Sequence, residues 1–104
     1  MEIIRKLSDY IEEEITDAGK YAACAIEFKD ERPELADLFF NLAEEELGHM
    51  ERLHAAVVTI IDEYRRTKGN PPEAMQAVYD YVHKKEIERT AEVKAKLSLY
   101  GFLT

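Results

Sequence analysis

Several residue types are scarce in this 104-residue chain, which has one cysteine, Cys24, no tryptophan, four glycines and three prolines. A single cysteine excludes an intrachain disulfide, and a reducing, cytoplasmic location is therefore expected. So few glycines and prolines disfavour an architecture of many short strands and turns. The longest apolar stretch, residues 55–61, is far shorter than the roughly 20 residues that span a bilayer. The first ten residues lack the apolar region of a signal peptide, so we expect neither secretion nor membrane insertion.

Acidic residues outnumber basic ones, 22 to 14, and give a formal net charge of −8. The excess lies in residues 1–50, which hold 14 acidic and 5 basic residues, whereas residues 51–104 hold 8 and 9. Nucleic acids and anionic membrane surfaces both favour a basic protein, so neither is a predicted partner. Hydrophobic residues make up 46% of the chain, too many for a disordered acidic tail.

Two short segments, KDERP and KGNPP, interrupt a chain that otherwise shows helical periodicity. The second segment has the pattern of a helix start, with Asn70 as the N-cap, Pro71 as the first helical residue and Glu73 as an acid in the first turn. We therefore predict an all-α chain that forms a single domain. Its three helices are expected at about 3–30, 33–68 and 71–99.

Each predicted helix repeats apolar residues at spacings of three and four, which places them along one face. The three faces comprise Ile4, Leu7, Ile11, Glu14, Ala18, Tyr21, Ala25 and Phe28; then Leu35, Leu38, Leu42, Glu46, His49, Leu53, Val57, Ile60 and Tyr64; then Met75, Tyr79, Val82, Glu86, Thr90, Val93, Leu97 and Tyr100. The second helix would be roughly 50 Å long. Helices of this length in so short a chain favour an antiparallel hairpin plus a third helix, with one flank left open. We expect a second copy to complete a four-helix bundle there.

Three positions on these faces have titratable side chains that can bind metals instead of apolar ones: Glu14, Glu46 and His49. A buried carboxylate costs several kcal/mol unless it is paired or neutralised. None of the three faces contains a lysine or arginine, so the sequence lacks the cation that a bound metal ion would supply. Carboxylates with one imidazole suit iron, and also manganese, better than a structural zinc site, which uses cysteine and histidine.

The spacing of these residues brings them to one level of the predicted hairpin. Glu46 and His49 are three residues apart and share one helix face. With a turn near residues 31–32, Glu14 lies roughly 17 residues before it and Glu46 roughly 15 after it. One chain offers three ligands, whereas a dinuclear site uses about six. A twofold dimer would supply two copies of each ligand and is the predicted assembly.

Other acidic residues near this level are not predicted as metal ligands. Asp17 and Glu45 border the same faces and are candidates for supporting the metal ligands or guiding iron, with solvated surface as the simpler interpretation. Glu51 also precedes a histidine, His54, by three residues, but this pair falls off the apolar face. We interpret Glu51 as a surface acid and His54 as a flanking residue.

Glu86 interrupts the third apolar face at a different level. If the third helix packs antiparallel on the second, Glu86 comes level with residue 54, roughly 12 Å along the axis from Glu46. At that level it could pair with His54 or hold iron away from the first cluster. We interpret His83, which is near Glu86, as a surface or capping residue.

The spacing Glu14-x6-Tyr21 and the segment PELADLFFNLAEEELGH, residues 33–49, resemble the ferritin-like superfamily, in particular half-length rubrerythrin-like and encapsulated-ferritin-type chains. The resemblance covers about half of the chain and one half of a ferritin-like bundle. It implies that Glu14 is a terminal or bridging ligand, Glu46 the bridging carboxylate and His49 the imidazole ligand of a di-iron site, with Tyr21 nearby. A single helix after residue 70, without a second motif, is similar to encapsulated ferritins, which build the site across a dimer interface and assemble into rings. A protein shell that encloses the rings is a further implied partner.

The ligand set and the resemblance together predict a ferroxidase, in which O2 or hydrogen peroxide oxidises Fe²⁺ to Fe³⁺ at a dimer interface for iron detoxification or storage. One alternative is rubrerythrin-like peroxide reduction, although a single cysteine leaves no rubredoxin-type iron site to deliver electrons. Another alternative is a metal-free helical dimerisation or interaction module whose buried acids specify the register. Alanine in place of Glu14, Glu46 or His49 would remove iron oxidation in the first case and leave the dimer intact in the last.

Overall fold

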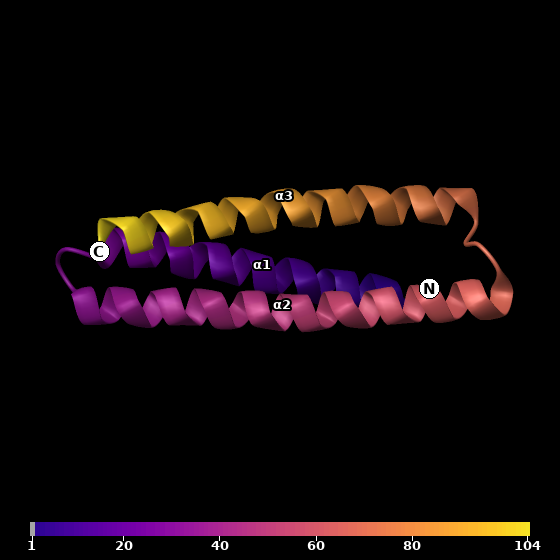
Figure 1. Cartoon of the computed structure of the whole chain (residues 1–104), viewed down its shortest axis with the longest axis horizontal. Helices are drawn as coiled ribbons and strands as arrows, with labels where there is room; N and C mark the ends of the chain where they lie inside the picture. The colour runs from indigo at the N-terminus through magenta and orange to yellow at the C-terminus, as the bar shows by residue number, and fades with distance from the viewer. Residues whose placement is uncertain (1) are drawn as a thin grey trace.

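The computed structural model describes residues 2–104, which form three long helices and two short connections. Helix α1 spans Glu2–Phe28, α2 spans Pro33–Lys68 and α3 spans Glu73–Leu103 (Figure 1). The predicted all-α fold class, with a hairpin followed by a third helix, is confirmed. Helix α1 ends before the predicted residue 30, α2 has the predicted bounds, and α3 begins and ends later than predicted.

The second connection shows why α3 begins late. Gly69 ends α2 with a positive φ of 83° and donates its backbone N–H to the Arg65 carbonyl, at 3.2 Å. The predicted N-cap at Asn70 is wrong, because Pro72 occupies that position with φ −52° and ψ 144°. A residue that precedes proline is disfavoured in the helical region, which keeps both Asn70 and Pro71 out of the helix. Helical geometry therefore starts only after the second proline.

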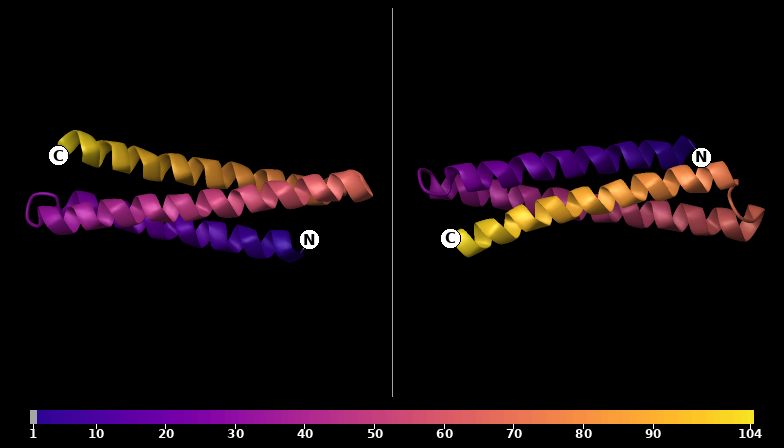
Figure 2. Two further views of the ribbon diagram at one scale, coloured as in Figure 1. Left: turned by 60° about the horizontal axis from the view of Figure 1, so that its bottom comes forward. Right: turned by 90° about the horizontal axis from the view of Figure 1, so that it is seen from above.

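The three helices lie alongside one another and form an elongated rod, with Cα extents of 55 × 18 × 18 Å (Figures 1 and 2). Helix α2 runs antiparallel to α1, and α3 returns in the direction of α1, so the C-terminus lies near the α1–α2 connection. The backbone of α3 approaches that of α1 over part of its length and that of α2 at few places. Helices α2 and α3 therefore meet chiefly through their side chains.

The core follows the α1–α2 interface. Ile11 and Ile15 of α1 and Val57 of α2 are almost completely buried, and each such side chain stabilises the fold by about 1.5–3 kcal/mol. Ala18 and Ala22 are also fully buried and allow close approach of the neighbouring helices. The rest of this core comprises Ile4, Ala43, Leu47, Met50, Ile61 and Val93.

The buried face of α2 is rotated from the predicted one. Ala36, Ala43, Leu47 and Met50 are buried, whereas Leu38, which we predicted on the apolar face, is 50% exposed. The apolar residues of α2 cover more than one face, and α1 packs on the side that carries the alanines because small side chains permit the closest approach. The predicted metal ligands on α2 therefore lie at the edge of the α1–α2 interface rather than at its centre.

The surface of the single chain retains several large apolar side chains. Those most exposed are Ile3, Tyr10, Leu38, Val58, Val78, Tyr81, Ile87, Leu99, Phe102 and Leu103. Within residues 2–104, no helix combines the length and apolarity needed to cross a membrane.

Candidate metal centre

Glu14 of α1 meets Glu46 and His49 of α2 in a group that we call the α1–α2 cluster. One ligand atom from each residue lies within 4.8 Å of the other two, so the three residues could hold a metal ion. The shortest ion-pair distance in the cluster, 3.4 Å, joins His49 Nδ1 to Glu14 Oε2. The structure thus brings together the three residues that the sequence spacing placed at one level of the hairpin.

The two carboxyl groups of the α1–α2 cluster interact strongly. The pKa of Glu46 is raised to about 7, first because its protonated form hydrogen-bonds with Glu14, and further because of burial and the negative charge of Glu14. The neighbouring His49 opposes this rise in pKa. Glu14 Oε2 is buried without a hydrogen-bond partner among residues 2–104. A bound cation would replace the shared proton and satisfy this oxygen.

The α1–α2 cluster offers two carboxylates and one imidazole to a metal ion, which is an oxygen-rich set of donors. The cluster is open to the surface, since the side chain of His49 is 53% exposed and that of Glu14 is 25% exposed. Ligands from outside the chain can therefore reach an ion held there, which three protein atoms alone would leave under-coordinated.

Of the two acids predicted near this cluster, Asp17 has an electrostatic effect there. Its side chain is exposed, yet its negative charge contributes to the raised pKa of Glu46. Asp17 also lines an acidic hollow on the surface of α1. Glu45 is exposed on α2, in keeping with the simpler interpretation of a solvated residue.

Tyr21 is half-buried one heptad after Glu14. Its ring stacks on Phe39 of α2, with ring centroids 6.1 Å apart. Phe39 also stacks on Phe28, with centroids 6.2 Å apart. The contacts of Tyr21 therefore assign it a packing role between α1 and α2.

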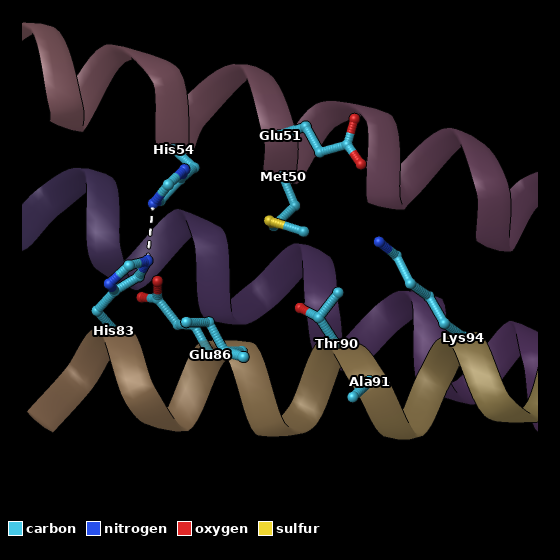
Figure 3. Close-up of a pocket in the computed structure, with 9 residues that line it drawn as sticks. Met50, Glu51, His54, His83, Glu86, Thr90, Ala91 and Lys94 are labelled. Carbon is cyan, nitrogen blue, oxygen red and sulfur yellow. Dashed lines mark hydrogen bonds between the residues drawn. The ribbon is translucent and has the colours of Figure 1, made fainter.

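A second group of titratable side chains lies between α2 and α3, and we call it the α2–α3 cluster: His54, His83 and Glu86. His54 Nε2 and His83 Nε2 are 3.0 Å apart, and one donates a hydrogen bond to the other according to the tautomers (Figure 3). Burial, together with the charge of His83, lowers the pKa of His54. All three residues line one cleft of about 360 Å³.

Glu86 is the buried charged residue of this second cluster, with 7% exposure. Burial raises its pKa to about 7, with a further contribution from Glu12 and an opposing one from Arg89. Its Oε1 atom is buried and unpartnered within the described part of the chain. Figure 3 shows the Glu86 side chain pointing back along α3 toward the two histidines.

The sequence located part of the α2–α3 cluster and missed the rest. Glu86 and His54 do line one cleft, as their predicted level suggests. The interpretation of His83 as a surface or capping residue is wrong, because its ring is half-buried against His54 and Tyr79. The spacing of three between His83 and Glu86 places both on one face of α3, and this pattern could have identified the pair.

Comparisons with known proteins leave the chain without an assigned relative: no family model, curated protein or solved structure matches it. The ferritin-like resemblance therefore depends on the residues quoted for it.

Proposed function

We propose that the protein is a ferroxidase of the ferritin-like type, whose α1–α2 cluster binds ferrous iron as substrate between two copies of the chain. The observation that carries this proposal is the convergence of Glu14, Glu46 and His49 within 4.8 Å across two helices. The unpartnered Oε2 of Glu14 adds a carboxylate oxygen that a cation would satisfy.

The reaction is a two-electron oxidation of a pair of ferrous ions. Two Fe²⁺ give one electron each, and with two protons they reduce O2 to hydrogen peroxide, or hydrogen peroxide to two molecules of water. The carboxylates of Glu14 and Glu46 suit both oxidation states of iron because they are hard, anionic ligands. Glu46, with its pKa of about 7, must release its proton when it binds a cation.

A second copy of the chain would complete the coordination of the iron. Two exposed apolar side chains support pairing on the face of the cluster. Tyr10 lies one turn before Glu14 on α1, and Leu38 lies three turns before His49 on α2. A twofold axis beside these residues would bury them and bring two copies of each ligand together. Iron detoxification or storage is the physiological role in this proposal, with rings of dimers and a protein shell as further expected partners.

The test is anaerobic titration of the metal-free protein with Fe²⁺, followed by exposure to air and measurement of ferric absorbance in the near ultraviolet. We expect saturation at about one iron per chain, which corresponds to two ions in a twofold dimer. Glu46→Ala should slow the oxidation at least about 100-fold. Loss of a residue that only supports a metal ligand lowers metal affinity or activity about 10- to 100-fold, and Glu46→Ala removes a ligand itself.

The matched control is Glu44→Ala, which removes an exposed glutamate two residues away on the same helix. It should leave both the stoichiometry and the oxidation rate within about twofold of the original protein. Equal oxidation by Glu46→Ala and the unaltered protein would exclude the α1–α2 cluster as the site.

A metal-free helical module is the second candidate, and the raised pKa of Glu46 is the observation that favours it. A proton shared between Glu14 and Glu46 would stabilise the pair without an ion. This candidate requires that Fe²⁺ does not bind above a buffer control and that Glu46→Ala leaves self-association intact or strengthens it.

A further inference from the structure

The α2–α3 cluster has nitrogen donors that already lie at the separation a metal ion requires. Two nitrogens bound to one zinc ion at about 2.0–2.1 Å stand about 2.8–3.4 Å apart for bond angles between octahedral and tetrahedral values. The two Nε2 atoms of His54 and His83 are 3.0 Å apart. The separation of the two nitrogens therefore suits a shared ion, which would lie to one side of the line that joins them once each ring tilts its lone pair toward it.

The two rings come from different helices and are held by stacking contacts. The ring of His83 stacks on two aromatic neighbours, with its centroid 4.9 Å from that of His54 and 5.6 Å from that of Tyr79. Such packing limits the rotamers of the ring and favours a preformed pair of donors. The lowered pKa of His54 favours its neutral imidazole, which is the form that binds metals.

Glu86 supplies the negative charge that a cation needs. Its carboxyl group is buried, and its Oε1 atom has no hydrogen-bond partner in residues 2–104. Burying such a group is costly unless a cation or a proton compensates it. Lys94 lines the same cleft, but Figure 3 shows it at the opposite end from the histidines, where it extends toward Glu51.

We propose that His54, His83 and Glu86 form a second metal site, which binds a divalent transition-metal ion, zinc in particular, and leaves positions open to water. Two histidines and one glutamate make a three-residue ligand set that zinc accepts with water as the fourth ligand. Among the described residues, only the α1–α2 cluster brings three ligand atoms within 4.8 Å of one another. Glu86 must therefore turn further toward the histidine pair when the ion binds.

An ion at this site would connect α3 to α2, two helices whose backbones approach each other at few places. Zinc binding should therefore raise the thermal stability of the protein, because the ion binds the folded chain and the unfolded chain lacks the preformed site. This inference does not depend on the proposed ferroxidase function, since the two clusters share no residue.

The experiment uses the full chain without an affinity tag and in a His49→Ala background. The chain has three histidines, so this background leaves His54 and His83 as its imidazole donors and disables the α1–α2 cluster. The protein is stripped with a chelator and titrated with Zn²⁺ by calorimetry and with Co²⁺ by visible absorbance. We expect about one ion per chain, an intense Co²⁺ spectrum that Zn²⁺ abolishes, and a melting temperature that rises with the Zn²⁺ concentration.

Two variants test the ligands separately. His83→Gln should weaken Zn²⁺ binding more than about 100-fold, because even loss of an outer-shell partner costs about 10- to 100-fold. Glu86→Gln removes the charge without changing the shape of the side chain and should weaken Zn²⁺ binding at least about 10-fold while helicity is retained. The control, Glu51→Gln, removes an exposed carboxylate that lines the same cleft and should change the affinity less than about twofold.

Two results would overturn the proposal. One is the absence of a Co²⁺ spectrum in the His49→Ala background. The other is equal Zn²⁺ affinity in this background with and without His83→Gln. Either result would mean that the hydrogen bond between the two histidines has only a structural role. Neither result would bear on iron oxidation at Glu14 and Glu46.

Discussion

The α1–α2 cluster and the α2–α3 cluster each contain a carboxyl group with a pKa near 7, but for different reasons. Glu46 owes its raised pKa first to the neighbouring carboxyl of Glu14. Glu86 owes its raised pKa first to burial, and the residues beside it in its own cluster are histidines. In the first cluster two acids share one proton, and in the second one acid lies without a hydrogen-bond partner in the cleft that two histidines line.

The two clusters also differ in how complete they are within one chain. Glu14, Glu46 and His49 lie at the edge of the α1–α2 interface, with a half-exposed histidine, so that an ion bound there would take its further ligands from outside the chain. The α2–α3 cluster lies in a cleft between two helices of the same chain. A second copy of the chain is therefore expected to matter for iron at the first cluster and not for zinc at the second.

The largest expected effect comes from removing the apolar side chains that flank the α1–α2 cluster. The double substitution Tyr10→Ser and Leu38→Ser should weaken dimer formation by at least about 100-fold, because burying each side chain contributes about 1.5–3 kcal/mol and a twofold interface contains each one twice. Iron oxidation per chain should fall with the dimer, whereas zinc binding at the α2–α3 cluster should change less than about twofold. Sedimentation velocity, iron oxidation and zinc calorimetry on the same samples would measure all three effects.

Val58→Ser provides the control for this experiment, since Val58 is an exposed apolar residue on the opposite side of α2 from His49. It should leave both self-association and iron oxidation unchanged. A dimer that survives the double substitution would show that the second copy does not cover this face.

An intermediate effect is expected on the pH dependence of stability in chelator-treated protein. Glu46 and Glu86 hold their protons up to about pH 7 in the folded chain, but release them near their ordinary value of 4.5 when unfolded. The folded chain therefore binds more protons between these values, and its free energy of unfolding should fall as the pH rises from about 4.5 to about 7. Urea denaturation across this range would measure the slope.

Substitutions can separate the two contributions to this slope. Glu46→Gln and Glu86→Gln should each flatten it, because each removes one titrating carboxyl group. Glu14→Gln should reduce the part due to Glu46 and leave the part due to Glu86 unchanged, since Glu14 is not among the residues that raise the pKa of Glu86. A slope unaffected by Glu86→Gln would contradict the assigned cause.

The smallest expected effect concerns Asp17, whose charge acts on the α1–α2 cluster without belonging to it. Asp17→Asn should slow Fe²⁺ uptake by about two- to fivefold at low ionic strength, and this difference should vanish in high salt because exposed charges are screened. Stopped-flow oxidation at two salt concentrations would measure it. The same substitution should leave zinc binding at the α2–α3 cluster unchanged, and an equal loss at both clusters would indicate a general effect of net charge.

The sequence predicted the helices well because their causes are local. Spacings of three and four residues along Ile4, Leu7 and Ile11 specify an amphipathic helix wherever the helix packs. The end of α2 at Gly69 is equally local. The N-cap prediction at Asn70 failed because the effect of the second proline on Pro71 outweighs the capping tendency of asparagine.

The α1–α2 cluster was predictable because the turn between two long helices fixes the register of the hairpin. Glu14 and Glu46 lie at similar distances from that turn, and His49 follows Glu46 on one face. The α2–α3 cluster was predictable only in part. The antiparallel return of α3 along α2 sets the level of Glu86, and this level could be counted from the sequence. The contact between His83 and His54 depends on how α3 is rotated about its axis, which no local pattern specifies.

The sequence by itself determined three helices, an acidic first half and a carboxylate–histidine set at one level of a hairpin. The tertiary structure decided which side of α2 faces α1, and so exposed Leu38 and His49 and buried Ala36 and Ala43. It also decided that α3 turns His83 and Glu86 toward α2. The physical reason is that periodicity defines the apolar face of each helix only broadly, whereas close packing of small side chains selects one rotation of each helix against its neighbours.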